Sequence, residues 1–74
     1  MSVVENGQRL RTLRGDKPAR AVADAVGISE STLLMYERGE RNPRDDIKVR
    51  LARFYRVGIG EIFYPDNFTN SEVS

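Results

Sequence analysis

Apolar residues recur at helical spacing in four segments of the chain, with short polar or glycine-containing stretches between them. Leu10 and Leu13 form the inward side of a predicted helix over about 4–14, which Gly15 and Asp16 end. Val22, Ala23 and Val26 form the inward side of a second predicted helix. The spacing predicts helices over about 4–14, 18–26 and 29–38, and a fourth that begins with Asp45 and Asp46.

Residues between the second and third helices are typical of a sharp turn. Gly27 can take the left-handed conformation just after a helix, since it has no Cβ. Ile28 is apolar and can pin the turn, Ser29 is a good N-cap, and Glu30 suits the positive end of the next helix. Two short helices joined in this way predict a helix-turn-helix unit, whose second helix can enter a DNA major groove.

Two helix starts carry further signals. Ser2 and Glu5 fit a capping box, although Gly7 weakens the first helix by up to ~1 kcal/mol and favours fraying of its first turn. Pro18 is predicted at the first position of the second helix, where its missing N–H costs nothing, with Asp16 or Lys17 as the cap.

The third and fourth helices each have a predicted inward face. In the third, Leu33 and Tyr36 face the core. Its opposite stripe holds Ser31, Leu34, Met35 and Arg38, at i, i+3, i+4 and i+7. In the fourth, the core-facing stripe is Ile47, Leu51, Phe54 and Tyr55. Its other sides carry four bases, for which a solvated face is the favoured interpretation and an extension of the basic surface the alternative: Lys48, Arg50, Arg53 and Arg56.

Charge is distributed unevenly along the 74 residues, which are enough for one domain with a small core. The net charge is +1, but residues 1–56 hold all twelve bases against eight acids, a balance of +4. Residues 57–74 hold three acids and no base. The excess of basic residues in 1–56 suits a protein with one face toward phosphate. The alternative interpretation of these charges is a normally solvated surface.

Missing residue types exclude several kinds of chemistry. The chain has no Cys and no His, so we expect no disulfide, no thiolate zinc site, no cofactor or metal, and no enzyme activity. The longest apolar run, 33–36, is far short of the ~20 residues of a membrane span. The first residues also lack the features of a signal peptide. We therefore expect a cytoplasmic protein with no membrane partner.

Several of these residues together resemble the Cro/C1-type helix-turn-helix family of phage repressors and small bacterial regulators. The matches lie between about 7 and 63: Val22-Ala23, Gly27-Ile28-Ser29, Thr32-Leu33, Tyr36-Glu37-Arg38-Gly39, Arg41-Asn42-Pro43, Leu51-Ala52, Val57 and Glu61-Ile62-Phe63. The resemblance implies an all-α, compact five-helix lambda-repressor-like domain over 1–63, with the helix-turn-helix at helices 2 and 3. It also implies a short closing helix in 57–63, with Gly58 at its cap and Ile59, Ile62 and Phe63 in the core.

The resemblance also implies which residues face DNA and which hold the domain together. Glu37 is expected to be structural, in an ion pair with Arg14 that ties helix 3 to helix 1. Ala19 stands where the family often has a phosphate-binding Gln, so Lys17 or Arg20 is expected to replace that contact. Base-facing residues are expected to be Ser29, Glu30, Ser31, Leu34 and Met35. Phosphate-facing residues are expected to be Lys17, Arg20, Thr32, Arg38, Arg41 and Arg44.

The favoured function is sequence-specific binding of double-stranded DNA by a small regulator, in particular a homodimeric repressor on a palindromic operator. The alternative is a protein-interaction module that uses Leu34 and Met35 as an exposed apolar patch. A protein antagonist or co-regulator is left open. Residues 64–74 are expected to be a disordered tail, or to assist dimerisation through Tyr64, Phe68 and Val73.

Overall fold

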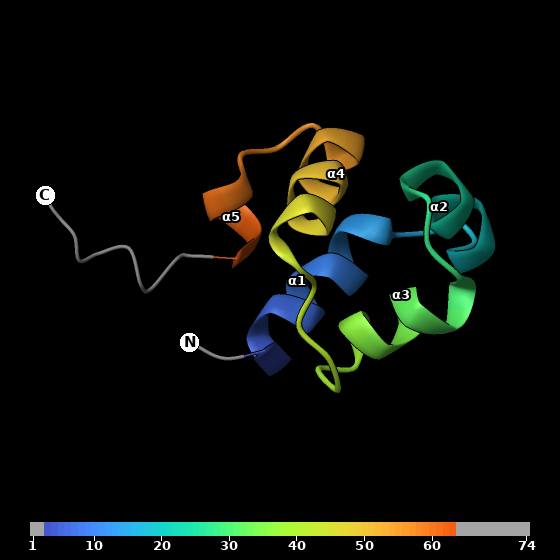
Figure 1. Cartoon of the computed structure of the whole chain (residues 1–74), viewed down its shortest axis with the longest axis horizontal. Coiled ribbons are helices and arrows are strands. Elements are labelled where there is room, and N and C mark those ends of the chain that lie inside the picture. Colours follow the sequence, from blue (N-terminus) through green and yellow to red (C-terminus); the bar gives the residue numbers. More distant parts are fainter. Residues whose placement is uncertain (1–2, 64–74) are drawn as a thin grey trace, which may run out of the picture.

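The computed structural model describes residues 3–63, and these form five helices with no strand among them. The helices are α1 (Val3–Arg14), α2 (Ala19–Val26), α3 (Glu30–Glu37), α4 (Asp45–Tyr55) and α5 (Ile59–Phe63). In Figure 1, α2 and α3 lie at one end of the bundle, α5 lies at the other, and α1 and α4 lie between them. The predicted all-α, five-helix architecture is confirmed. Ser2 and the tail 64–74 lie outside the described residues.

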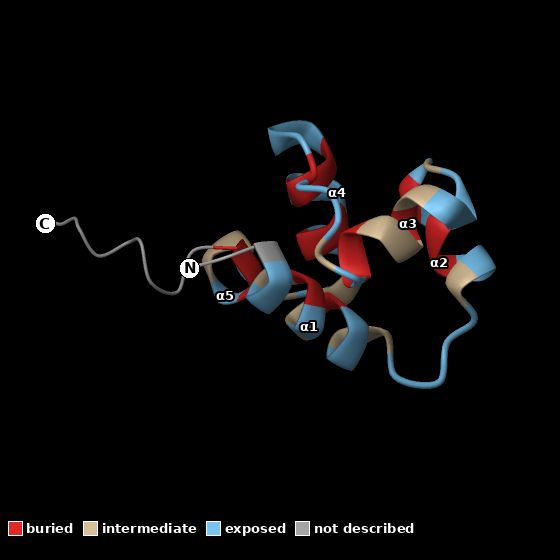
Figure 2. Ribbon diagram, turned by 90° about the horizontal axis from the view of Figure 1, so that it is seen from below, coloured by how far each residue is buried: buried red, intermediate tan, exposed pale blue. Residues whose placement is uncertain are grey.

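The core is formed where the apolar sides of all five helices meet. Leu10 of α1, Leu33 of α3 and Leu51 of α4 are completely buried. Burying one such side chain contributes roughly 1.5–3 kcal/mol, so these contacts dominate the stability of so small a domain. Figure 2 shows the buried positions on the inward side of each helix. The buried apolar set is Leu10, Val22, Ala23, Val26, Leu33, Tyr36, Ile47, Leu51, Ala52, Ile62 and Phe63.

Gly7 lies where α1 crosses the C-terminal end of α3. A Cβ built on Gly7 would be 2.5 Å from the carbonyl oxygens of both Tyr36 and Glu37. Gly39, just after α3, has φ +77°, and a Cβ there would be 2.7 Å from the Cα of Val4. The two glycines therefore allow α1 to approach the end of α3 closely. The prediction treated Gly7 only as a weak point in its helix and missed this packing role.

The prediction that Lys48 lies on a solvated face of α4 is wrong. Lys48 is only 8% exposed, and its Nζ lies 5.4 Å from the centre of the Phe63 ring. Its Nζ is also 3.9 Å from Oδ1 of Asp45. A lysine can bury its aliphatic stem against an apolar surface, and α5 supplies that surface here. Phe54 and Tyr55, predicted to face the core, are half-buried and pack against its edge.

The start of α2 also differs from the prediction. Pro18 is the N-cap rather than the first helical residue, with φ −63° and ψ 139°, so neither Asp16 nor Lys17 caps the helix. Proline has no side-chain acceptor, and no side-chain hydrogen bond caps α2. The carbonyl of Pro18 accepts the N–H of Val22 at 3.2 Å and thereby begins the helical pattern. Proline's fixed φ suits both positions, and the extended ψ decides between them.

Candidate nucleic-acid interface

The turn between α2 and α3 is held by backbone bonds and one side-chain cap. Gly27 takes the left-handed conformation, with φ 89° and ψ 32°. The N–H groups of Gly27 and Ile28 both donate to the carbonyl of Ala23, at 2.8 and 3.0 Å. Ser29 then caps α3, since its Oγ accepts the N–H of Thr32 at 3.1 Å. The predicted turn chemistry is therefore present, and it fixes the direction in which α3 leaves α2.

The cap joins two residues that were expected to contact DNA. The hydroxyl of Ser29 donates to Oγ1 of Thr32 at 2.8 Å. Each hydroxyl is both a donor and an acceptor, so this contact leaves the pair with further bonding capacity for a group outside the helix. Ser29 is exposed and Thr32 is half-buried. The two hydroxyls thus lie together at the N-terminal end of α3, joined to each other and to the first turn of the helix.

The outer face of α3 is polar at its start and partly covered further on. Glu30 and Ser31 are exposed, as is Arg38 just after the helix. Leu34 and Met35 are only partly exposed. The expectation that these two residues form an exposed apolar patch is therefore wrong. The large apolar residues exposed among those described are Val4 on α1 and Val49 on α4.

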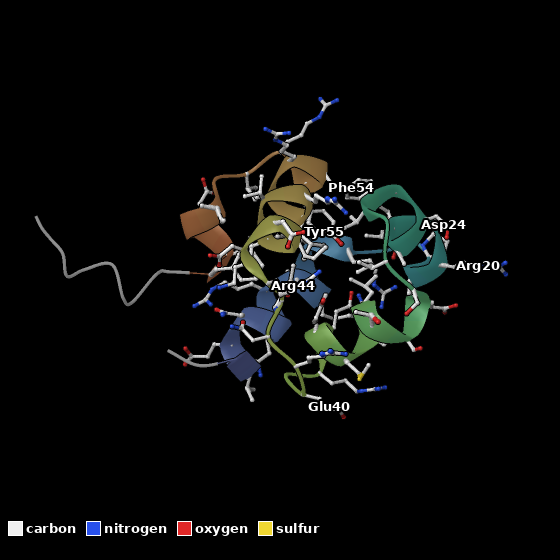
Figure 3. All side chains as sticks on the ribbon, viewed as in Figure 1. Arg20, Asp24, Glu40, Arg44, Phe54 and Tyr55 are labelled. Atoms are coloured by element: carbon white, nitrogen blue, oxygen red, sulfur yellow. The ribbon has the colours of Figure 1, made fainter. Side chains whose placement is uncertain are left out.

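Basic residues lie on both flanks of the helix-turn-helix unit. Lys17 and Arg20 are exposed at the start of α2, and Figure 3 shows Arg20 extending away from the bundle. On the other flank, Arg38 Nε lies 3.2 Å from Glu40 Oε2, and both side chains are more than half exposed. Exposed pairs of this kind contribute at most about 1 kcal/mol, so Arg38 can exchange its partner for a phosphate at little cost.

An open groove separates the α2–α3 turn from the start of α4. Ser29 and Thr32 contribute hydroxyl groups to it, and three arginines contribute guanidinium groups. Its one acid is Asp46, whose Oδ1 lies 3.9 Å from Nε of Arg44. The groove therefore carries an excess positive charge and hydroxyl donors, a combination that suits an anion. Its three arginines are Arg41, Arg44 and Arg50.

Arg50 is a member of this groove that the prediction missed. It was assigned to a solvated helix face because it falls on the polar side of α4. No local pattern indicates that α4 passes beside the α2–α3 turn, which is 24 residues earlier in the chain. The predicted phosphate-facing residues Thr32, Arg41 and Arg44 line the groove, while Lys17, Arg20 and Arg38 do not.

The expected ion pair between Arg14 and Glu37 is present in the structure. Arg14 donates from Nε to Oε2 of Glu37 at 2.8 Å and from Nη2 to Oε1 at 3.1 Å. The side chains are 13% and 4% exposed, and the hydrogen bonds to Glu37 raise the pKa of Arg14 above its already high usual value. Arg14 Nη1 also donates to the carbonyl of Lys17 at 2.9 Å. One guanidinium therefore ties together the ends of α1 and α3 and the loop before α2.

Residues 3–63 contain neither a candidate membrane span nor a candidate metal cluster. None of their helices is both long and apolar enough to cross a membrane. Within the same range, no three His, Cys, Asp or Glu side chains gather closely enough to hold a metal ion.

The paired helices, the capped turn and the basic flanks define a small helical domain of the helix-turn-helix class. A family model described as a helix-turn-helix domain matches residues 5–62. The chain belongs to this helix-turn-helix domain family, and the resemblance to Cro/C1-type regulators is confirmed.

Two known proteins show how far the similarity extends. The transcriptional repressor RstR of the cryptic phage CTXphi, from Vibrio cholerae, is 34% identical over 64 residues. The match covers 84% of this chain but 57% of RstR, so the chain spans little more than half the length of this relative. The crystal structure of the restriction-modification controller protein C.AhdI from Aeromonas hydrophila matches with a TM-score of 0.76 and 33% identity. That match covers 82% of this chain and 96% of C.AhdI.

Proposed function

We propose that this protein binds double-stranded DNA in a sequence-specific manner and regulates transcription, as a repressor. The observation that carries the proposal is the geometry of α3, whose exposed polar start adjoins a groove lined by three arginines. Both similar proteins support it, because one is named as a transcriptional repressor and the other as a controller protein. In this proposal α3 enters the major groove, and the protein needs no cofactor.

Glu30 and Ser31 reach base edges first in this proposal, because they are exposed in the first turn of α3. Serine can bond to several bases, and a glutamate can accept from the N4 amino group of cytosine. Leu34 and Met35 lie one turn further on, where their partly exposed side chains contact thymine methyl groups. Arg38, Arg41 and Arg44 neutralise phosphates beside the major groove of the DNA, so the affinity for DNA falls as the salt concentration rises.

We further propose that two copies bind a palindromic operator. α3 has eight residues, and its few exposed side chains read only a short half-site. A symmetric dimer doubles that contact and requires half-sites ~34 Å apart, one turn of the duplex. Repression then follows from blocking RNA polymerase at the operator, which places the protein in the cytoplasm with the DNA.

The proposal is tested by selecting duplexes from a random pool with the purified protein, then titrating salt and measuring the mass of the complex. We expect enrichment of a palindrome, two protein chains for each duplex, and an affinity that decreases steeply with salt. Ser31→Ala should change the preferred bases, whereas Arg41→Gln should weaken binding to all sequences alike. Weak binding to every duplex without enrichment would refute the proposal and direct attention to a protein partner.

A further inference from the structure

Arg50 of α4 crosses from its own helix to the end of α2. Its Nη1 donates to the carbonyl oxygen of Val26 at 3.4 Å, a contact that spans 24 residues of sequence. Val26 is the last residue of α2, and the last carbonyls of a helix have no partner within the helix. A Cβ built on Gly27 would lie 3.3 Å from the same Nη1. The guanidinium of Arg50 therefore lies directly over the helix-turn-helix turn and braces it from α4.

The contact with Val26 uses only part of the bonding capacity of Arg50. A guanidinium has five N–H donors in a planar fork, which matches two oxygens of a phosphate. Arg50 is exposed, lines the groove beside Ser29 and Thr32, and forms no ion pair with any residue that the structure describes. The carboxylate of Asp46 lies within ion-pair distance of Arg44. Arg50 thus brings an uncompensated charge into the groove.

We propose that Arg50 binds a backbone phosphate of the duplex that α3 enters, while its bond to Val26 holds the turn in place. This inference rests on the proposed function. The phosphate lies in the groove, where the hydroxyl of Thr32 and the guanidinium of Arg41 supply further donors. Arg50 then acts both as a phosphate ligand and as a positioning residue for α3, because the same side chain contacts the phosphate and the end of α2.

The test compares Arg50→Gln with Arg53→Gln, a matched control. Arg53 is on the same helix, is exposed, and lies outside the groove, so both variants lose one charge from α4. The probe is the duplex most enriched by the wild-type protein, and the dissociation constant is measured from 50 to 200 mM salt. We expect Arg50→Gln to reduce the slope of log affinity against log salt by about 0.9, the value for one phosphate contact. Over that range the wild type should therefore lose about 3.5-fold more affinity than Arg50→Gln.

Stability measurements separate the two roles of Arg50. If it only braced the turn, Arg50→Gln would lower the urea midpoint and leave the salt slope of the folded protein unchanged. If Arg50→Gln does not fold, the DNA affinity of Arg50→Lys tests the inference instead. A lysine keeps the charge but lacks the planar fork with which Arg50 reaches Val26 and a phosphate together, so Arg50→Lys should keep the slope and lose affinity by about threefold or more.

Four results would overturn the inference. A wild-type slope in folded Arg50→Gln would remove Arg50 from the interface, and wild-type affinity in Arg50→Lys would remove the proposed link between the phosphate and the turn. Both results would leave the proposed function intact. An equal loss of slope in Arg53→Gln would show a general charge effect instead of a contact. Failure of the wild-type protein to bind any duplex would overturn the proposed function and this inference together.

Discussion

Replacing Gly7 with alanine tests the close approach of α1 to α3. Considered only as a position within a helix, the change should stabilise the protein by up to about 1 kcal/mol, because alanine has the higher helix propensity. The structure predicts the opposite sign. The new Cβ would meet two carbonyl oxygens at 2.5 Å and the Glu37 carbonyl carbon at 2.9 Å. All three are backbone atoms, so no side-chain rotation relieves the contact and α1 must move.

The expected magnitude follows from these two opposing effects. Overpacking costs about 1–3 kcal/mol, and three backbone contacts of 2.9 Å or less put Gly7→Ala in the upper part of that range, about 2–3 kcal/mol, from which a gain in helix propensity of up to about 1 kcal/mol is subtracted. We expect a net loss of about 1–2 kcal/mol, which corresponds to a decrease in Tm of roughly 4–16 °C for a domain of this size. The measurement is urea and thermal unfolding followed by far-ultraviolet circular dichroism.

Gly60→Ala is the matched control for this experiment. Gly60 is also helical, has no positive φ, and a Cβ there would meet no atom within 4 Å. Helix propensity alone therefore applies, and we expect a gain of up to about 1 kcal/mol. If Gly7→Ala were as stable as the wild type or more so, while Gly60→Ala behaved as expected, the close packing of α1 on α3 would be refuted.

Three further changes test other contacts. Glu37→Gln removes the charge that pairs with Arg14 and should reduce the free energy of unfolding by about 1.5–3 kcal/mol, because the pair is partly buried. Replacing both residues with methionine should restore much of the loss, and equal urea midpoints for the single variant and the wild type would contradict this. Burial raises the pKa of Tyr55 to about 12 from 10 in the unfolded chain, so its contribution to stability is intact below pH 10 and is lost as the pH rises from 10 toward 12. Tyr55→Phe removes a buried hydroxyl that has no partner in the described structure. This variant should lack the decline in stability at high pH and be no less stable than the wild type at pH 7. Arg56 ends α4 in the left-handed conformation, with φ 58°. Arg56→Gly should therefore stabilise the protein by about 1 kcal/mol in unfolding experiments. Arg56→Ala is the control, because it loses the same charge but keeps the strained φ, and it should not stabilise the protein.

The local features of this fold could be predicted because local sequence determines them. The cap of α3 at Ser29 and the left-handed Gly27 depend on residues within one turn of the chain. The core positions of α2, α3 and the first half of α4 follow from helical periodicity, and those in α5 from the family resemblance. The Arg14–Glu37 pair, which links residues 23 apart, was also expected only through that resemblance.

The features that sequence reasoning missed depend on which element covers which. Local sequence predicts Lys48 as a surface lysine, but α5 packs over it in the structure. Local sequence likewise predicts Gly7 only as a weak point in its helix, but α1 approaches the end of α3 there. Arg50 reads as part of a solvated face until α4 passes the turn. Periodicity identifies the inward face of a helix, but it does not identify the neighbour across that face or a polar residue recruited at its edge.

These contacts hold α3 at both ends and leave the polar start of its outer face exposed. At the C-terminal end of α3, Gly7 packs on the last carbonyls of the helix and Arg14 forms an ion pair with Glu37. At its N-terminal end, the Ser29 cap and the contact of Arg50 with Val26 fix the turn. Neither Gly7 nor Arg14 lines the groove, so changing either should weaken DNA binding only by misplacing α3, with the salt slope unchanged. Arg41→Gln and Arg50→Gln should lower the slope itself, because each removes a phosphate contact. The salt slope therefore separates the residues that orient the reading helix from those that touch the duplex.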